Sequence, residues 1–391
     1  MKKFVSIILA VILAFGALMP AYAADGESST KLQFNKDGSF RIMQIADIQD
    51  GPLLFEIVKD FLDEVIPYAQ PDLIVLTGDN IAAGAAHIGI HSLDLLLVEA
   101  AIGRFMSIFE KYDVPVAIVF GNHDAEEIVT KEEQMKIYQS YDNCIAIDEG
   151  EALFGCGTYN VPIYSSTDIE KIAYNLWMID SNMYAEEDDG YDYVHEDQIN
   201  WYVSKSNELK AQNGGVAVPS MMFQHIIVPE IYDALVEIPK VTDACVEHNG
   251  KYYVLDPNTT KSGELNEAPC PSNFNKGQFS AVKNQGDVVA MCFGHDHTNS
   301  FVVAHEGVDL VNTPGVGFNS YGDDGRGVRV IDIKEGTRDY ETDVITYKEF
   351  YGDDLAADAR FTLYGSEFET LDRIVAFFEY IIYSIKNLLS F

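Results

Sequence analysis

PDLIVLTGDN, residues 71–80, joins four apolar residues to a glycine and a carboxylate, and the same pattern recurs along the chain. RIMQIADIQD (41–50), PVAIVFGNHD (115–124) and VVAMCFGHDH (288–297) also lead from an apolar run into possible metal ligands. Short apolar runs bounded by turn residues predict buried strands. One Gly-Asp or His-x-His is a weak signal, but four such sites at strand ends indicate a shared metal site.

Strand-like and helix-like runs alternate through most of the chain. The predicted strands are Phe40–Ala46, Leu73–Leu76, Val116–Phe120, Leu176–Ile179, Val216–Phe223 and Val288–Phe293, and the predicted helices are Leu53–Ala69, Ser92–Tyr112 and Glu196–Ala211. This alternation favours an α/β core with much parallel pairing. The later strands Phe301–Ala304, Val308–Val311, Val328–Ile333 and Asp343–Tyr347 lack long helices between them, which indicates antiparallel pairing. We therefore expect an α/β fold with two mixed sheets packed face to face and flanked by helices.

The chain divides into one large unit and a C-terminal extension. We expect a catalytic domain over residues 31–335, a strand extension and linker over 336–365, and an amphipathic helix over 366–391. The segment Asp243–Gln278 is rich in Asn, Pro, Gly and Ser, and is expected to be a long loop or an insertion that can cover the site. The terminal helix is expected to dock on the domain, to self-associate or to contact a membrane surface peripherally.

The N-terminus has the pattern of an export signal. Met1-Lys2-Lys3 precedes the apolar run Phe4–Met19, and Ala21-Tyr22-Ala23 supplies small residues for cleavage. These features predict a signal peptide over residues 1–23 and a secreted protein, or one held at the extracytoplasmic surface. An uncleaved anchor is the alternative, although the apolar run is short for a membrane span.

An exported protein can form disulfides, and this chain has five cysteines. Cys292 lies within an apolar run and is expected to be a core residue. Cys144 with Cys156, and Cys245 with Cys270, are then the natural pairs. Five free thiols are the alternative.

Charge limits the partners. The chain has 62 Asp and Glu against 26 Lys and Arg, a net charge of -36. Such an acidic chain is a poor partner for nucleic acid or an anionic membrane. A small anionic substrate therefore needs a local cationic centre, which bound metal ions would supply.

The candidate ligands are expected to meet at one edge of the sheets, because the loops after parallel strands lie at the same end. The candidates are Asp47, Asp79, Asn122, His225, His295 and His297. Carboxylate, amide oxygen and imidazole together suit zinc, iron or manganese. Two such ions about 3.5–4 Å apart can clamp both oxygens of a displacement at phosphorus.

In this order the motifs resemble those of the calcineurin-like metallophosphoesterase superfamily: Asp-x-His, Gly-Asp, Gly-Asn-His-(Asp/Glu), a lone His and Gly-His-x-His. The resemblance extends from about Arg41 to Ile333. Within it, Thr77–Ile81, Gly294–Asn299 and the Gly-rich Pro314–Gly327 are similar to the purple-acid-phosphatase-like branch. The resemblance implies two divalent or trivalent ions (iron, zinc or manganese) and hydrolysis of phosphomonoesters by a metal-bound hydroxide.

Carried over by position, the resemblance makes Asp79 the bridging ligand. It assigns Asp47, Gln49 and His297 to the first metal and Asn122, His225 and His295 to the second. His123 is then expected over the phosphorus, where it binds phosphate or protonates the leaving oxygen, with Asp124 to orient it. Asn122 and Arg326 are the further candidates for substrate contact.

The chain departs from the family pattern at two positions. Gln49 replaces the histidine of Asp-x-His, and its amide is a weaker ligand, so the first metal site is expected to be looser. Asp50 can replace that histidine only through a backbone kink. Ala82 stands where purple acid phosphatases carry their colour-giving tyrosine, so no purple colour is expected. The alternatives are a phosphodiesterase of the same superfamily and a catalytically impaired surface-binding protein.

Overall fold

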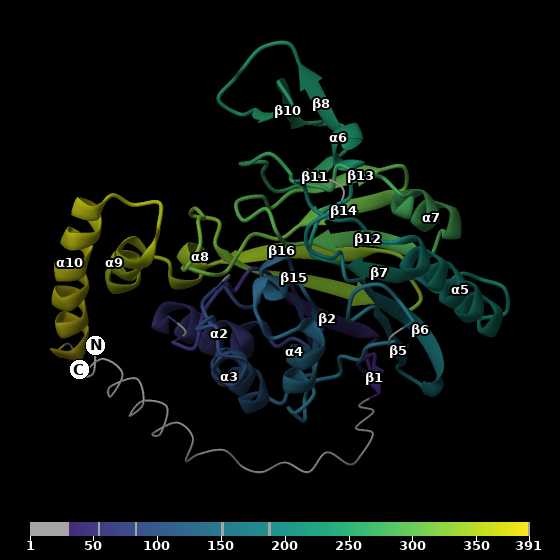
Figure 1. Ribbon diagram of the computed structural model, residues 1–391, viewed down its shortest axis with the longest axis horizontal. Helices are drawn as coiled ribbons and strands as arrows, with labels where there is room; N and C mark the ends of the chain where they lie inside the picture. Colours follow the sequence, from purple (N-terminus) through teal and green to yellow (C-terminus); the bar gives the residue numbers. More distant parts are fainter. Residues whose placement is uncertain (1–30, 54, 83, 150–151, 187–188, 390–391) are drawn as a thin grey trace.

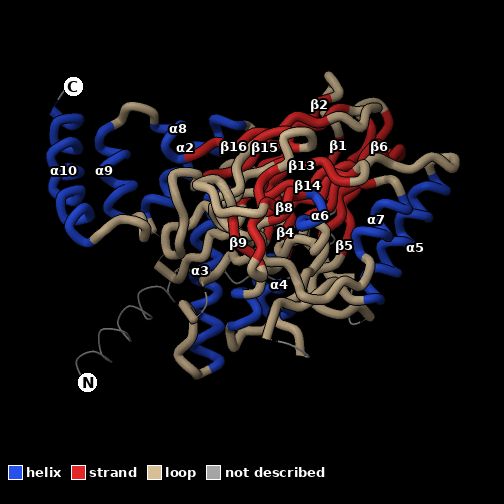
Figure 2. The backbone as a smooth tube through the Cα atoms, turned by 90° about the horizontal axis from the view of Figure 1, so that it is seen from above, coloured by secondary structure: helices blue, strands red, loops and turns tan. Residues whose placement is uncertain are grey.

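The computed structural model describes residues 31–53, 55–82, 84–149, 152–186 and 189–389. The predicted signal peptide, residues 1–23, lies outside these ranges, and export stays a prediction. Two large sheets pack face to face, a small third sheet projects from them, and helices cover the outer faces (Figures 1 and 2). The expected α/β fold is confirmed. Within the described ranges, no helix has the length and apolar character needed to cross a membrane.

The first large sheet has five strands in the order β16-β15-β2-β3-β4. The strands are β2 (Ser39–Ile45), β3 (Leu73–Thr77), β4 (Val116–Val119), β15 (Gly327–Lys334) and β16 (Tyr340–Thr346). The first three are parallel, and every residue of β3 is buried, as expected for a strand covered on both faces. The helices α2 (Glu56–Ala69), α3 (His91–Lys111) and α4 (Lys131–Tyr138) lie on this side of the molecule (Figure 1).

The second large sheet has eight strands in the order β1-β5-β6-β7-β12-β14-β13-β11. They are β1 (Leu32–Gln33), β5 (Tyr159–Ser165), β6 (Asp168–Met178), β7 (Ser220–Phe223), β11 (Thr260–Ser262), β12 (Val288–Phe293), β13 (Val302–His305) and β14 (Val308–Asn312). The neighbours β6, β7, β12 and β14 are parallel, whereas β13 is antiparallel to β14. The helices α5 (Glu196–Gln212) and α7 (Gln278–Gln285) pack on this sheet.

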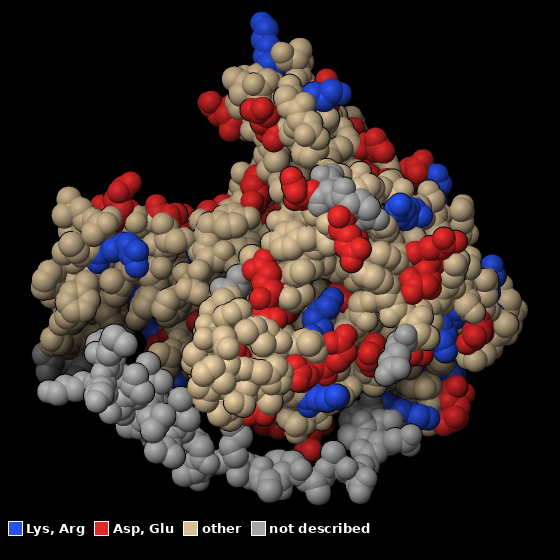
Figure 3. Space-filling model, in the orientation of Figure 1, with Lys and Arg blue, Asp and Glu red and all other residues tan. Residues whose placement is uncertain are grey.

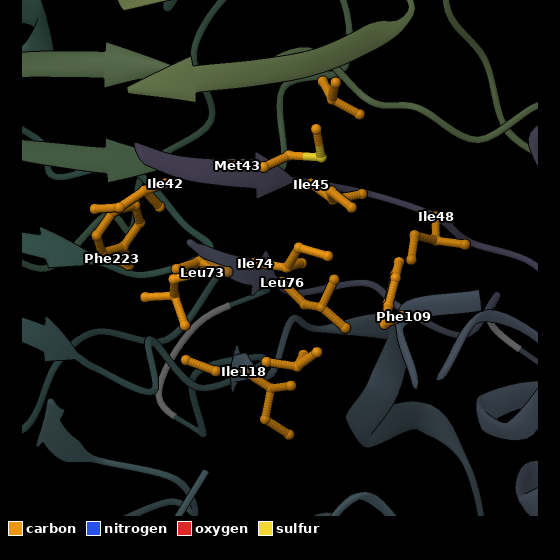
Figure 4. Packing of buried hydrophobic residues seen from close by; sticks show 14 of the residues in the cluster. Ile42, Met43, Ile45, Ile48, Leu73, Ile74, Leu76, Phe109, Ile118 and Phe223 are labelled. Atoms are coloured by element: carbon orange, nitrogen blue, oxygen red, sulfur yellow. The ribbon is translucent and has the colours of Figure 1, made fainter. Parts of the chain in front are cut away.

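The two sheets are joined by apolar packing and by a few buried polar contacts. Figure 4 shows Ile42, Ile74 and Ile118 from neighbouring strands within the larger core cluster. Gln44 Nε2 donates to the carbonyl of Phe293 across the interface at 3.0 Å. Arg329 is also buried there and donates to the carbonyl of Asn312 at 2.7 Å, so it does not face outward from the sheet.

Of the two alternatives predicted for Asp243–Gln278, a long loop or an insertion, the structure excludes a structureless loop. The segment contains β9 (Val246–His248), β10 (Lys251–Leu255) and β11, and β8 (Leu235–Ile238) pairs with β10 to complete the small sheet above the short helix α6 (Ile231–Ala234) (Figure 1). The hairpin turns at Asn249 and Gly250, which have φ angles of 51° and 75°. Asn-Gly is the preferred sequence for this two-residue turn, because both positions need a left-handed backbone.

The C-terminal extension is more helical than predicted. After β16, the expected linker folds into α8 (Tyr347–Tyr351) and α9 (Leu355–Tyr364), and α10 (Thr370–Leu389) forms where an amphipathic helix was predicted. Thr346 and Asp354 cap α8 and α9 by accepting backbone N–H donors with their side chains. All five cysteines are free thiols, so neither suggested disulfide is formed.

Candidate metal centre

The candidate ligands leave the strands through strained backbone. Asp47, Asp79 and His295 have φ angles of 53°, 49° and 71°, which side-chain-bearing residues adopt rarely and mostly at functional sites. Glycines make room for this arrangement. A Cβ on Gly121 would lie 2.1 Å from Oδ1 of Asp79, and one on Gly78 would lie 2.6 Å from Nδ1 of His225. The strand ends are thus shaped to bring carboxylates and imidazoles together.

One group of ligands surrounds Oδ2 of Asp79. Nε2 of His225 lies 3.2 Å from this oxygen and 3.2 Å from Nδ1 of His295, and one ligand atom from each of the three residues lies within 4.8 Å of the others. Nδ1 of His225 faces the carbonyl of Thr77 at 2.8 Å, which turns Nε2 toward the site. Oδ1 of Asn122 is buried without a hydrogen-bond partner. This group matches the ligands expected for the second metal.

A second group surrounds Asp47. Its Oδ1 lies 3.3 Å from Nε2 of His297 but makes no hydrogen bond, while its Oδ2 accepts the backbone N–H of His295 at 3.0 Å. Nδ1 of His297 faces the carbonyl of Tyr321 at 3.0 Å, so Nε2 is directed inward. The group contains the carboxylate and imidazole expected for the first metal.

Gln49 contacts the proposed bridging residue. Its side chain is buried, and Nε2 donates to Oδ2 of Asp79 at 3.0 Å, the oxygen that His225 also approaches. Asp50 does not substitute for the missing histidine, because its carboxylate accepts the backbone N–H groups of Gly51 and Phe55 instead. Burial raises the pKa of Asp50 to about 6.

Charge within the centre is unbalanced without cations. Burial disfavours the imidazolium of His225, but the carboxylates of Asp79 and Asp47 outweigh burial and raise the pKa of His225 to about 10. Burial also disfavours the ionised form of Asp79, yet His225 and the neighbouring histidines hold its pKa below the ordinary value. For His295, burial and the charge of His225 both lower the pKa. In the metal-free centre, the proton on His225 therefore supplies positive charge that a metal ion would otherwise supply.

The residues present fit bound metal. Two buried oxygens, Oδ1 of Asp47 and Oδ1 of Asn122, have no hydrogen-bond donor. Unpaired buried acceptors are costly, and a cation satisfies them. The imidazoles of His225 and His297 each direct one nitrogen inward while a carbonyl faces the other, which is the usual support of a metal-binding histidine. The donor set of oxygens and imidazole nitrogens suits zinc, iron or manganese.

His123 lies at the mouth of this centre. Its side chain is 32% exposed, and its Nε2 is 3.8 Å from Oδ2 of Asp79. Nδ1 lies 3.0 Å from Oε2 of Glu126, whose other oxygen accepts from the hydroxyl of Tyr184 at 2.6 Å. The predicted orienting role of Asp124 was therefore wrong, and Glu126 holds the ring. His123 and Glu126 lie three residues apart on the short helix His123–Glu126, which also contains Asp124. This i, i+3 spacing was the sequence signal available for their contact.

Asp124 instead joins two loops. Its carboxylate is fully buried and accepts backbone N–H groups from Gly121 at 2.9 Å and from Asn80 and Ile81 at 3.0 Å each. The contacts fix the loop after β4 against the loop after β3. Burial and the charge of Asp79 raise the pKa of Asp124 to about 7.

Asp124→Asn is expected to destabilise the protein by about 2–3 kcal/mol, because an amide group replaces one acceptor and places a donor against a buried N–H. Urea unfolding of the metal-free protein measures this loss. A variant as stable as the wild type, with activity lost, would instead return Asp124 to a direct role in catalysis.

The structure does not place Arg326 at the centre. Its side chain is 1% exposed, and the guanidinium donates to the carbonyls of Gly317 and Ser320 and pairs with Glu367 at 3.1 Å. The predicted substrate contact was wrong because a buried arginine with these partners cannot also reach a ligand. It fastens the Gly-rich loop to the C-terminal extension.

Three tyrosines line the mouth: Tyr321, a weak candidate for substrate contact from the sequence, and Tyr184 and Tyr191, which the sequence reading missed. Tyr191 packs edge-on against His295, with ring centroids 4.4 Å apart, and Tyr184 stacks on Tyr191. Tyr321 stacks on His297 at 4.2 Å, and its hydroxyl donates to Glu267 at 2.7 Å. Glu267 follows β11, so part of the segment expected to cover the site does lie against it.

Comparisons with known proteins agree with this geometry. The family described as calcineurin-like phosphoesterase matches residues 40–299, which include every proposed metal ligand. "Probable inactive purple acid phosphatase 14" of Arabidopsis thaliana is 26% identical over 371 residues, 85% of each chain. "Probable inactive purple acid phosphatase 29" of the same plant is 27% identical and covers 77% of this chain and 78% of that one. "Phosphatase DCR2" of Saccharomyces cerevisiae is 27% identical over 69% of this chain and 46% of its own length.

Proposed function

This chain belongs to the calcineurin-like phosphoesterase family, and on that premise we propose that it is an exported phosphomonoesterase that works with two metal ions. The observation that carries the proposal is the meeting of two carboxylate–imidazole groups around Asp79 and Asp47, below the exposed ring of His123. These residues come from strands far apart in the sequence. Such a meeting has no role in packing and leaves buried acceptors without donors.

The ligands divide between two ions. Asp47, Gln49 and His297 would hold the first, Asn122, His225 and His295 the second, and Asp79 both. When bound, the ions supply positive charge that binds phosphate oxygens and acidifies water. The neutral amide of Gln49 makes the first site the weaker one.

His123 is the residue placed to handle the leaving group. With Nδ1 held by Glu126, its Nε2 is free to face a phosphoester at the mouth and to donate a proton to the departing oxygen. The hydroxyl of Tyr184 donates to the other oxygen of Glu126, and it thereby supports the residue that holds the ring of His123. Asn122 can contact the same phosphate through its buried amide.

The surroundings favour a substrate with one phosphate. The mouth is lined by the neutral side chains of Tyr184, Tyr191 and Tyr321, which supply no cation for a second phosphate. Acidic side chains also outnumber basic ones on the face shown in Figure 3. A polyphosphate would need further cations.

Rates on p-nitrophenyl phosphate and its bis ester test this assignment. Faster hydrolysis of the monoester by zinc- or manganese-loaded protein supports the proposal. Preference for the bis ester would make the chain a phosphodiesterase of the same family.

Metal binding is expected to tighten as the pH rises. In the metal-free protein the pKa of His225 is about 10, so its ring is protonated at pH 7 and must release a proton to bind an ion. Below the pKa of His225, each further unit by which the pH falls lowers the affinity for metal by up to about tenfold for each proton released on binding. Zinc titrations by calorimetry between pH 6 and 8, in buffers of different ionisation enthalpy, count these protons. An affinity that does not change with pH would show that His225 is not a ligand.

A second function has support of its own. Gln49 replaces a metal-binding histidine, and two relatives carry the words "probable inactive" in their names. These observations favour a catalytically impaired protein that binds a surface or ligand. The wild type would then hydrolyse neither ester when loaded with metal, and Asn122→Ala would behave as the wild type does.

Gln49→His is expected to tighten zinc binding at the first site about tenfold or more, because imidazole is a better zinc ligand than an amide. Competition with a chelator of known affinity measures the gain. Unchanged affinity would mean that Gln49 already serves as an adequate ligand, or that no ion binds beside it.

A further inference from the structure

Helix α10 exposes a continuous apolar stripe. Eight large apolar side chains on it are between 39% and 70% exposed: Leu371, Ile374, Val375, Phe377, Phe378, Ile381, Ile382 and Ile385. Monomeric proteins rarely expose contiguous apolar surface beyond about 300–600 Å². With side chains of this size, the exposed fractions leave on the order of 700 Å² on this one helix.

The helix is packed the opposite way round from an ordinary surface helix. Its side toward α9 carries Ala376, which is 2% exposed, and the exposed Arg373 donates through Nε to the carbonyl of Leu363 in α9 at 2.9 Å. Figures 1 and 2 both show α10 beside α9 at one end of the molecule, with α9 on the side of the main body. A surface helix normally turns its apolar side to the protein. Here that side faces solvent.

The support below α10 is firmly attached to the domain. Arg360 of α9 pairs with Asp60 of α2 at 2.7 Å, and Phe361 packs on Phe318 and Tyr347 in the main core. The ion pair between Arg326 and Glu367 fixes the turn that leads into α10. The stripe is therefore held facing outward by the fold.

Spacing along the stripe indicates what covers it. Leu371, Ile374, Phe378, Ile381 and Ile385 follow one another at intervals of three and four residues, which is the seam of a helix that packs against another helix. Val375 and Ile382 widen the seam on one side. We propose that this stripe joins two copies of the chain, with α10 of one copy packed against α10 of the second.

The exposed area fits an interface between two copies of the chain. On the order of 700 Å² is exposed on this helix, close to the roughly 800 Å² per partner that a stable interface buries.

A lipid surface fits this helix less well. Helices that lie on membranes usually carry Lys and Arg beside the apolar face. Here the charged residues beside the stripe are of both signs, with Glu379 and Lys386 on one side and Arg373 on the other, and the chain has a net charge of -36, which anionic lipid repels.

Sedimentation of the purified full chain without detergent, from 1 to 100 µM, tests the proposal. We expect a dimer, and Phe378→Glu with Ile382→Glu is expected to raise its dissociation constant by about 100-fold or more, because two charges enter an apolar interface. Val216→Glu with Val241→Glu is the matched control, since both valines are well exposed elsewhere on the chain, and it should leave the dimer intact. Near-ultraviolet circular dichroism confirms that each variant is folded.

A monomeric wild type at 100 µM overturns the proposal, as does a dimer that Phe378→Glu with Ile382→Glu leaves intact. If that monomer also floats with phosphatidylcholine–phosphatidylglycerol vesicles through Phe378 and Ile382, the stripe binds lipid instead.

Discussion

Asp79→Asn is expected to lower kcat/KM for phosphoesters by roughly 1,000-fold or more and to reduce the bound metal from two ions to at most one. Oδ2 of Asp79 lies between the imidazole of His225 and the amide of Gln49, and its Oδ1 accepts the backbone N–H of His123 at 2.8 Å. Asparagine keeps the shape of the side chain but loses the charge that two cations share. Steady-state kinetics and elemental analysis of the same preparation measure both effects.

A buried carboxylate elsewhere is the control for this experiment. Asp309 in β14 accepts from Lys261 at 2.6 Å and from Tyr340 at 2.7 Å, outside the metal centre. Asp309→Asn is expected to lower stability while metal content and kcat/KM stay near the wild-type values. Should Asp79→Asn retain both ions and full activity, Asp79 does not bridge them.

His123→Asn is expected to lower kcat for alkyl phosphates by about 100- to 10,000-fold, which is the usual contribution of a general acid. The loss should be much smaller for p-nitrophenyl phosphate, because p-nitrophenolate leaves without a proton. Bound metal should not change, since the ring of His123 is exposed at the mouth and is not among the proposed ligands. A series of esters with leaving groups of different pKa measures this dependence.

Glu126→Gln separates holding the ring from donating the proton. The variant keeps a partner for Nδ1 of His123 but removes the charge, so it should lose less activity than His123→Asn and show the same dependence on the leaving group. An equal loss on every ester after His123→Asn would place His123 in phosphate binding rather than proton transfer.

The sequence was most informative where strands end. Asp47, Asp79, Asn122 and His295 directly follow apolar runs, and period and turn residues locate such runs without knowledge of the rest of the fold. Once the strands are parallel, their ends meet at one edge, so the ligand groups could be predicted before the structure. Two signals indicated that His225 is a ligand: its place after an apolar run and the family resemblance.

The errors concern side chains whose roles depend on distant partners. Asp124 follows His123 in sequence, but its carboxylate turns toward the backbone of Asn80 and Ile81 from another loop. Arg326 pairs with Glu367 in the C-terminal extension. No local pattern encodes either contact, because both arise from the packing of separate segments.

Some missed elements did carry local signals. The Asn249-Gly250 turn predicts a hairpin, and Thr130 with Glu133 forms the capping box that begins α4. Tyr184 and Tyr191 at the mouth had no such signal. They lie in an irregular acidic stretch, and only the folded chain brings them to His295 and Glu126.

Metal content tests the central claim most directly. After loading with zinc and removal of free metal at pH 8, elemental analysis of the wild type and of Asp79→Asn should give up to two ions per chain and at most one, respectively. At least one tightly held ion in the wild type is required, even if Gln49 leaves the first site partly filled. A wild-type chain that retains no stoichiometric metal, or an Asp79→Asn variant that retains as much as the wild type, would contradict a shared metal centre.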